Sequence, residues 1–279
     1  MNTTFEIGSM TKQFTAVAIL QLQEQGKLSV NDTIDKYFEG FEKGKKITVQ
    51  SLLRMRSGLS DYINEPTVFF PADAAEEYNT KDSKEQDIDR DFVEKYLNDA
   101  PLRDEPGSQF YYCNTNYYLL GKIIEKVSGM TYEDYISEKI FIPCEMTKSN
   151  TDFKGTEAIG YDAAGNSKSL THNVAMGCGD INSNIIDVFK WDQSLLNHKI
   201  ISEKSFIEMT TGDSPYCYGV FADDLSILHG GSTYVFNSYN IIYLKDKMTI
   251  TVLVNEPIES TSSTAIAGNI RKFFTGQEV

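Results

Sequence analysis

The sequence predicts an α+β fold, in which helices dominate the first part of the chain and an antiparallel sheet forms near its end. Up to about residue 200, apolar residues recur mostly at helical spacing. After Pro215 the chain turns into short runs rich in β-branched and aromatic residues, separated by turn residues such as Asp223-Asp224. Strands gathered after a helical stretch are typical of the α+β class. The expected strands are 216–222, 225–229, 239–244 and 248–254.

The expected helices carry their apolar residues on one side and end at stop signals. In the first, 9–25, Ser9 is the expected N-cap and Gly26 follows the last turn. The acid-rich segment 73–91 lacks this periodicity and is expected to be an exposed loop or lid, and 153–182 is expected to be irregular. Helices are expected at 9–25, 47–55, 115–127, 132–139, 185–196 and 263–274.

Composition excludes several classes of function. The chain has 279 residues, of which 41% are hydrophobic, and its formal net charge is -14. A nucleic-acid partner is therefore not expected, because phosphate binding needs a concentrated basic face and the lysines here mostly stand beside acidic residues. The four cysteines form no Cys-x-x-Cys pair and the three histidines are far apart, so neither a metal nor a cofactor is expected.

The cellular location is predicted from the absence of a membrane span and of a leader peptide in the sequence. No apolar run approaches the roughly 18 residues that a membrane span needs. The first residues carry no basic and apolar leader, and isolated thiols favour a reducing compartment. The sequence as written is expected to be cytoplasmic, and extracytoplasmic if an N-terminal segment is missing.

Ser9 and Lys12 form a Ser-x-x-Lys pair at the start of the first expected helix. This spacing places the two side chains about one turn apart on one face, so the amine can reach the hydroxyl. A serine hydroxyl needs a partner that removes its proton before it becomes a good nucleophile. Lys12 can be that partner only when neutral, which requires burial or a nearby cation. The pair alone is weak evidence for catalysis, because Ser-x-x-Lys strings are common and also fit an N-cap serine with a surface lysine.

Further motifs follow in order along the chain. Residues 5–15 around Ser9, the Tyr112-Cys113-Asn114 segment and His229-Gly230-Gly231 together resemble the motifs of the class C β-lactamase, penicillin-binding-protein and family VIII esterase group. Segments 47–59 and 191–196 also resemble that family. The resemblance covers about residues 5 to 255, and three motifs in order make it specific.

The resemblance implies a fold and roles. Residues 1–45 and 205–279 would form an α/β part that contains the sheet, and 46–204 a mainly helical part. The active site would lie at their junction. Ser9 would be the nucleophile, Lys12 and Tyr112 would move protons, and the remaining residues would position the substrate. Those positioning residues are Asn114, His229, Gly230, Gly231 and Ser232.

Each of these residues also has a plainer interpretation. Asn114 stands just before a helix and fits an N-cap, Tyr112 fits a core or turn tyrosine, and His229 ends an expected strand. Under the family interpretation, the amide of Asn114 holds Lys12 and the substrate. The backbone N–H groups of Ser9 and Ser232 form an oxyanion hole. Two glycines after His229 would let a substrate approach the strand closely.

The sequence departs from the family pattern at several positions. Cys113 replaces a serine, and its thiol beside the site is expected to be open to oxidation or alkylation. His229 stands where the family often has lysine, which weakens an anchor for a carboxylate and favours esterase or peptidase chemistry. Only eight residues precede Ser9, so a helix and two strands of the family fold would be missing. The strand Met248–Val254 would then lack its neighbour and form an open edge of the sheet. Three explanations stay open: the chain is a fragment, a second copy of the chain covers the edge, or the fold has adapted.

The predicted function is that of a serine hydrolase that passes an acyl group through Ser9. Its substrates would be amides or esters, with D-amino-acid peptides, β-lactams and small esters as candidates. One alternative is a non-catalytic binding protein of the same fold. Another is a sensor that becomes acylated but deacylates very slowly.

Overall fold

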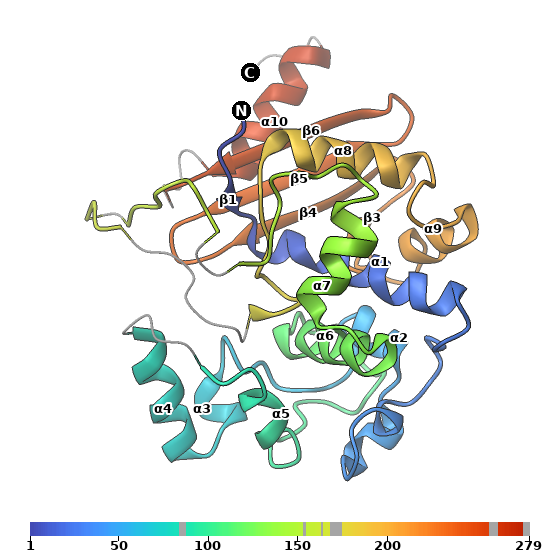
Figure 1. The fold of residues 1–279 in the computed structure, drawn as a ribbon, viewed down its shortest axis with the longest axis vertical. Coiled ribbons are helices and arrows are strands. Elements are labelled where there is room, and N and C mark those ends of the chain that lie inside the picture. Colours follow the sequence, from blue (N-terminus) through green and yellow to red (C-terminus); the bar gives the residue numbers. More distant parts are fainter. Residues whose placement is uncertain (84–87, 153–154, 163, 168–174, 257–261, 276–279) are drawn as a thin grey trace.

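The computed structural model describes the whole chain except residues 84–87, 153–154, 163, 168–174, 257–261 and 276–279. Figure 1 shows a sheet with flanking helices in its upper half and a group of helices in its lower half. The sheet has the order β3-β4-β5-β6 and is antiparallel throughout, which confirms the predicted meander, although only the end of the expected first strand, 216–222, is a strand. Its strands are β3 (Phe221–Ala222), β4 (Ser226–Ser232), β5 (Asn237–Tyr243) and β6 (Met248–Val254).

The two faces of this sheet pack against different helices. Side chains alternate along a strand, so Ile241 and Tyr243 of β5 point to one face and Asn240 to the other. The first face packs on α10 (Ser263–Thr275). On the opposite face, Asn240 donates a hydrogen bond of 2.7 Å to Asp192 of α8 (Ile185–Leu196). In the part of the chain that the structure describes, β6 pairs only with β5, so its outer edge is unpaired there.

Helix α1 (Thr11–Glu24) runs between the sheet and the helices below it (Figure 1). Every residue from Thr11 to Leu20 is buried, because the helix contacts other elements all around. Phe14 stacks on Trp191 with ring centroids 4.1 Å apart. Directly before α1, the 3₁₀ turn η1 (Gly8–Met10) lies against β4. This arrangement positions the residue pair of the first motif beside the sheet.

The remaining elements form the lower half and its connections. Most are short, and the longest, α6, packs against α1. They are β1 (Phe5–Glu6), η2 (Ile34–Lys36), η3 (Glu42–Lys46), α2 (Val49–Leu53), α3 (Pro66–Phe69), α4 (Ala72–Ser83), α5 (Phe92–Tyr96), α6 (Asn114–Ser128), α7 (Tyr132–Ile136), the π turn η4 (Ser137–Phe141), β2 (Asn182–Ser183) and α9 (Glu203–Thr210). β1 pairs with β2. The division of the chain at residues 45 and 204 remains our proposal.

Two local predictions were wrong. Most of the segment 73–91 is not a loop, because α4 occupies it and buries Ala74, Ala75 and Tyr78. These apolar residues at i, i+1 and i+4 form one helical face, which the surrounding acidic residues hid in the sequence. Ser9 is also not an N-cap, because it lies inside η1.

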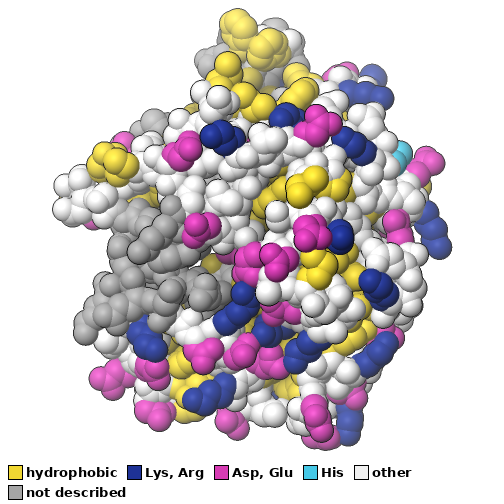
Figure 2. All heavy atoms as spheres, in the orientation of Figure 1, with side chains coloured by type: hydrophobic (Ala, Val, Ile, Leu, Met, Phe, Trp, Pro, Cys, Tyr) yellow, Lys and Arg dark blue, Asp and Glu magenta, His cyan; other side chains and the backbone are white. Residues whose placement is uncertain are grey.

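Charged side chains of both signs are interspersed over the face drawn in Figure 2. The apolar group at the top of that view lies on the end of α10, where Phe273 and Phe274 are exposed. Over the ranges that the structure describes, no helix is both long enough and apolar enough to cross a membrane.

The carboxyl group of Asp192 makes stability depend on pH. Burial raises its pKa to about 8, and the hydrogen bond from Asn240 offsets only part of this. Between pH 4 and 8 the folded protein therefore keeps a proton that the unfolded chain has released. Stability falls as pH rises through this range, by up to about 1.4 kcal/mol per pH unit.

Replacing Asp192 by asparagine removes this titration. Urea unfolding at several pH values gives the free energy of unfolding of the native protein and of Asp192→Asn. The value for the native protein minus the value for the variant is expected to fall from pH 4 to 8 and then to level off. Asp99→Asn, at an exposed carboxyl group, is the control and should show no such trend. A difference for Asp192→Asn that is constant with pH would contradict this explanation.

Candidate active site

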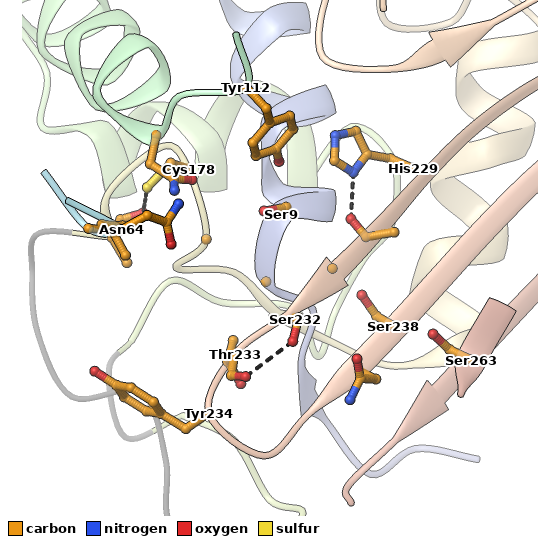
Figure 3. Close-up of a pocket in the computed structure, with 18 of the residues that line it drawn as sticks. Ser9, Asn64, Tyr112, Cys178, His229, Ser232, Thr233, Tyr234, Ser238 and Ser263 are labelled. Atoms are coloured by element: carbon orange, nitrogen blue, oxygen red, sulfur yellow. Dashed lines mark hydrogen bonds between the residues drawn. The ribbon is translucent and has the colours of Figure 1, made fainter. Parts of the chain in front are cut away.

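A cleft of about 650 Å³ opens between β4 and the helical half. It brings the predicted site residues together, because Ser9, Tyr112, Asn114 and 229–232 line it and Lys12 lies directly behind Ser9. In Figure 3, Ser9 lies at the centre of this cleft, below Tyr112 and between Cys178 and His229. The elements that meet here are η1, β4 and the start of α6.

The amine of Lys12 is completely buried and has three hydrogen-bond partners. It lies 2.9 Å from Ser9 Oγ, 2.9 Å from Asn114 Oδ1 and 2.7 Å from the carbonyl oxygen of Cys178. The amide oxygen and the carbonyl oxygen can only accept hydrogen bonds, so each takes one N–H of Lys12. In a neutral amine, which has two N–H groups and one lone pair, the lone pair then faces the hydroxyl of Ser9. This geometry suits Lys12 as the base that takes the proton of Ser9.

Asp61 sets the orientation of the Asn114 amide. Asp61 is completely buried, and its Oδ2 accepts hydrogen bonds of 3.0 Å from both the backbone N–H and the Nδ2 of Asn114. The same oxygen accepts from Asn64 Nδ2 at 2.8 Å, and Oδ1 accepts from the backbone of Ile63 and Asn64. Because Nδ2 of Asn114 is bound to Asp61, its Oδ1 must point to Lys12.

Asn114 is therefore not an N-cap, contrary to one of the two interpretations of the sequence. It is the first residue of α6, and Cys113 occupies the N-cap position. Its side chain binds Lys12, as the resemblance implies. Nδ2 carries a second hydrogen, and Asn114 lines the cleft, so this hydrogen is available to a bound molecule.

Tyr112 lies over the amine of Lys12. The ring centroid is 4.9 Å from Nζ, and Figure 3 shows the hydroxyl pointing toward Ser9. Tyr112 is therefore not a core residue but lines the cleft, half-buried. Its hydroxyl is placed where a proton could pass between Ser9 and a leaving group.

His229 lies in the middle of β4 and is buried, so the expectation of a histidine at the end of a strand was wrong. Its Nδ1 is 2.5 Å from the carbonyl oxygen of Gly230, and its Nε2 is 3.3 Å from the hydroxyl of Tyr216. Burial, with a further contribution from the nearby Lys12, lowers the pKa of His229 to about 3. The imidazole is therefore neutral at pH 7.

Strand β4 packs tightly against the turn that carries Ser9. Gly8 has φ +50°, and a Cβ there would lie 2.9 Å from the backbone nitrogen of Ser232. Only glycine suits this position, because the backbone is left-handed and there is no space for a side chain. The backbones of Ser9 and Ser232 are thus brought side by side, as an oxyanion hole made from their N–H groups requires.

The two glycines after His229 differ in their surroundings. A Cβ on Gly231 would overlap the carbonyl oxygen of Ile7, whereas on Gly230 it would meet nothing closer than 3.5 Å. Gly231 lines the cleft too, but the space of its missing side chain is taken by this chain's own backbone, a reason for glycine that the sequence interpretation did not include. Gly230 lines the cleft without such a contact.

Gly231→Ala is expected to destabilise the protein by at least about 2 kcal/mol, because the new methyl group forces β4 away from η1. Gly230→Ala is the matched control and should change stability by less than about 0.5 kcal/mol. Thermal unfolding of the two variants measures this difference. Equal losses of stability would contradict the predicted close contact of Gly231.

The prediction of a reactive thiol at Cys113 was wrong. Cys113 is 1% exposed, and its sulfur lies 3.5 Å from the carbonyl oxygens of Leu59 and Ser60. Burial raises the pKa of this thiol to about 12, so it carries no reactive thiolate at neutral pH.

The sequence interpretation missed three parts of the site. Asp61 stands two residues beyond the quoted segment 47–59, and an aspartate next to a family-like segment could have drawn attention. The carbonyl group of Cys178 falls in a stretch expected to be irregular, and backbone groups leave no signal in side-chain patterns. Tyr216 lies in an expected strand, where an aromatic residue is ordinary.

A Ser-x-x-Lys pair held between an antiparallel sheet and a helical half, with a tyrosine above it, places this molecule among proteins of the β-lactamase and penicillin-binding-protein fold. The model of the family described as Beta-lactamase matches residues 1–272. The chain belongs to this family.

Relatives and solved structures agree with this assignment. PbpX, a candidate penicillin-binding protein of Bacillus subtilis (strain 168), is 36% identical over 228 residues, which cover 78% of this chain and 53% of that protein. The octameric penicillin-binding protein homologue from Pyrococcus abyssi matches with a TM-score of 0.77 and 28% identity, over 99% of this chain and 67% of that one. A D-stereospecific amidohydrolase from Streptomyces sp. shares the fold with a TM-score of 0.81 and 22% identity, over 99% and 88% of the two chains. This chain spans about half the length of PbpX.

Proposed function

We propose that the protein is a serine hydrolase that transfers an acyl group from an amide or an ester to water through Ser9. The observation that carries this proposal is the contact between Lys12 Nζ and Ser9 Oγ at 2.9 Å, with the other two donors of the amine held by acceptors. A lysine on the protein surface would not have its amine fixed by three hydrogen-bond partners in this way. The family supports the same chemistry.

The reaction follows from the geometry of the cleft. Lys12 takes the proton of Ser9 as Oγ attacks the carbonyl carbon, and the oxygen that becomes negative accepts hydrogen bonds from the backbone of Ser9 and Ser232. The proton then passes through Lys12 and Tyr112 to the leaving amine or alcohol, which departs and leaves an ester on Ser9. Water attacks this ester in the same way and releases the acid.

The substrates that we propose are D-amino-acid peptides, β-lactams and small esters. The relatives include proteins named penicillin-binding proteins, and a solved structure of the same fold is named a D-stereospecific amidohydrolase. The first name points to β-lactams, and the second points to amides of D configuration. The two names support a class of substrate, and rate measurements on this protein are needed to identify the substrate within that class.

Hydrolysis of 4-nitrophenyl butyrate and of D-alanine 4-nitroanilide tests the proposal. Steady turnover that disappears in Ser9→Ala is the expected result. No release of nitrophenol or nitroaniline by folded protein would instead favour the non-catalytic alternative. A single burst equal to the enzyme concentration, without turnover, would favour the slowly deacylating sensor.

We also propose that the protein self-associates through the free edge of β6. The edge is unpaired in the described part of the sheet, and a relative of known structure is octameric. An unpaired strand is a template for pairing with a second copy. Light scattering should then give a multiple of 31.4 kDa, and a monomer at all concentrations would refute the proposal. Met248→Lys, at the start of β6, should weaken the association.

A further inference from the structure

The described residues that line the cleft beside Ser9 are polar or apolar but uncharged. None of the described residues that line it is an aspartate, glutamate, lysine or arginine. Its polar groups are hydroxyl and amide groups, as in Asn64, Ser238 and Thr264, and Tyr112 and Phe221 supply apolar surface. These groups can hydrogen-bond a neutral molecule, but they supply no full positive charge to pair with an anion.

The two basic side chains nearest to the reacting serine, Lys12 and His229, cannot serve as an anchor for a carboxylate. Lys12 is completely buried, and its three hydrogen-bonding positions face Ser9, Asn114 and the carbonyl group of Cys178. His229 lines the cleft but is 3% exposed and is surrounded by the rings of Tyr112, Tyr216 and Phe221, with centroids 5.8 to 6.2 Å away.

Both ring nitrogens of His229 are already engaged. The carbonyl oxygen of Gly230 can only accept, so Nδ1 carries the proton of the neutral ring. Nε2 then has no proton of its own, and it lies 3.3 Å from the hydroxyl of Tyr216. Tyr117 donates its own proton to the carbonyl oxygen of Leu53 at 2.9 Å, so it can only accept from Tyr216, and the one proton of Tyr216 is shared between Tyr117 and Nε2 of His229. Nδ1 thus faces Gly230 and Nε2 faces Tyr216, so His229, held between them, offers no N–H to the cleft.

We infer that the acyl group taken by this site is uncharged, and that Tyr216, by holding His229, makes the site reject acyl donors that carry a free carboxylate close to Ser9. This inference rests on the proposed serine hydrolase and narrows its substrates. A carboxylate entering the cleft would lose water without gaining a cation. Neutral esters and capped amides suit the site better than acyl donors with a free acid group.

The test compares two esters that differ in one group. The mono-4-nitrophenyl ester of adipic acid ends in a carboxylate, and the 4-nitrophenyl ester of adipamic acid ends in a carboxamide of nearly the same size. After subtraction of the uncatalysed rate, kcat/KM is expected to favour the carboxamide by at least about 30-fold. Equal values for the two esters would overturn the inference. Hydrolysis of neither would instead overturn the proposed function.

Tyr216→Phe tests the role of the tyrosine. Without the hydroxyl beside it, Nε2 can take up a proton and the ring can turn to the other tautomer. The preference for the carboxamide is expected to shrink by about tenfold. Tyr218→Phe is the matched control, because this buried tyrosine bonds Gln50 and not His229, and it should leave the preference unchanged.

His229→Lys provides a second variant that does not depend on the tyrosine. A cation at this position should raise kcat/KM for the carboxylate ester relative to the amide. An unchanged preference in both Tyr216→Phe and His229→Lys would overturn the assigned roles of these residues. A loss of activity toward both esters, with an unchanged ratio of their kcat/KM values, would also overturn these roles, because it would indicate a merely structural effect.

Discussion

Replacing Lys12 by methionine is expected to lower kcat/KM for a neutral 4-nitrophenyl ester by about 10³-fold, within the range of proton-transfer catalysis by a positioned side chain. Methionine keeps the apolar length of lysine but has no group that takes the proton of Ser9. The substrate still meets the same cleft, because Lys12 lies behind Ser9 and does not line it. We therefore expect the loss in kcat rather than in KM.

Two further variants separate the role of a base from that of a charge. Lys12→Arg keeps a cation and hydrogen-bond donors but cannot become neutral, so it should be as inactive as Lys12→Met. Lys36→Met, at an exposed lysine, should retain full activity and controls for the loss of a positive charge. If Lys12→Arg retained most of the activity, the base would have to be another group.

Asp61→Ala is expected to lower kcat by about 100-fold, although Asp61 hydrogen-bonds Asn114 rather than Ser9 or Lys12. Without the carboxylate, nothing holds Nδ2 of Asn114, and the amide can turn its NH2 group toward Lys12. Displacement of a catalytic group by about 1 Å costs a factor of this size. The variant also leaves the backbone N–H groups of Ile63 and Asn114 without their acceptors, at about 1–3 kcal/mol each.

Asp61→Asn separates positioning from stability. One oxygen of the asparagine can still accept from Asn114, while the backbone N–H groups bound to the other oxygen lose their acceptor. We expect this variant to be destabilised but to keep kcat within about tenfold of the native value. Rates are measured below the unfolding transition of each variant, with the folded fraction determined by circular dichroism. Equal kcat losses for alanine and asparagine would contradict the positioning role.

The sequence predicted the fold well where patterns are regular. The meander of β4, β5 and β6 and helix α8 lie within a few residues of the expected runs, since alternation and helical spacing are local properties. The helix α4 was missed because its apolar residues are few and stand among acidic ones. Its burial depends on Tyr62 and Phe70, aromatic partners that only the tertiary structure brings together.

The candidate site was predictable as a set of residues but not as a set of contacts. The three motifs identified the residues around Ser9 and part of the cleft lining, because their types and order carry the signal. The orientation of Asn114 by Asp61 and of His229 by Tyr216 depends on which atom donates and which accepts. Such information appears only when the side chains have been placed in space. The close contact of Gly231 with Ile7 could not be predicted for the same reason.

The most direct test of the central claim is the capture of an acyl group on Ser9. The native protein is mixed with a neutral 4-nitrophenyl ester, quenched in acid within milliseconds and digested, and the peptides are weighed by mass spectrometry. We predict that the peptide containing Ser9 gains the mass of the acyl group, and that Ser9→Ala gains none. Hydrolysis of the ester with no acyl group on Ser9, or with the group on another residue, would contradict the mechanism.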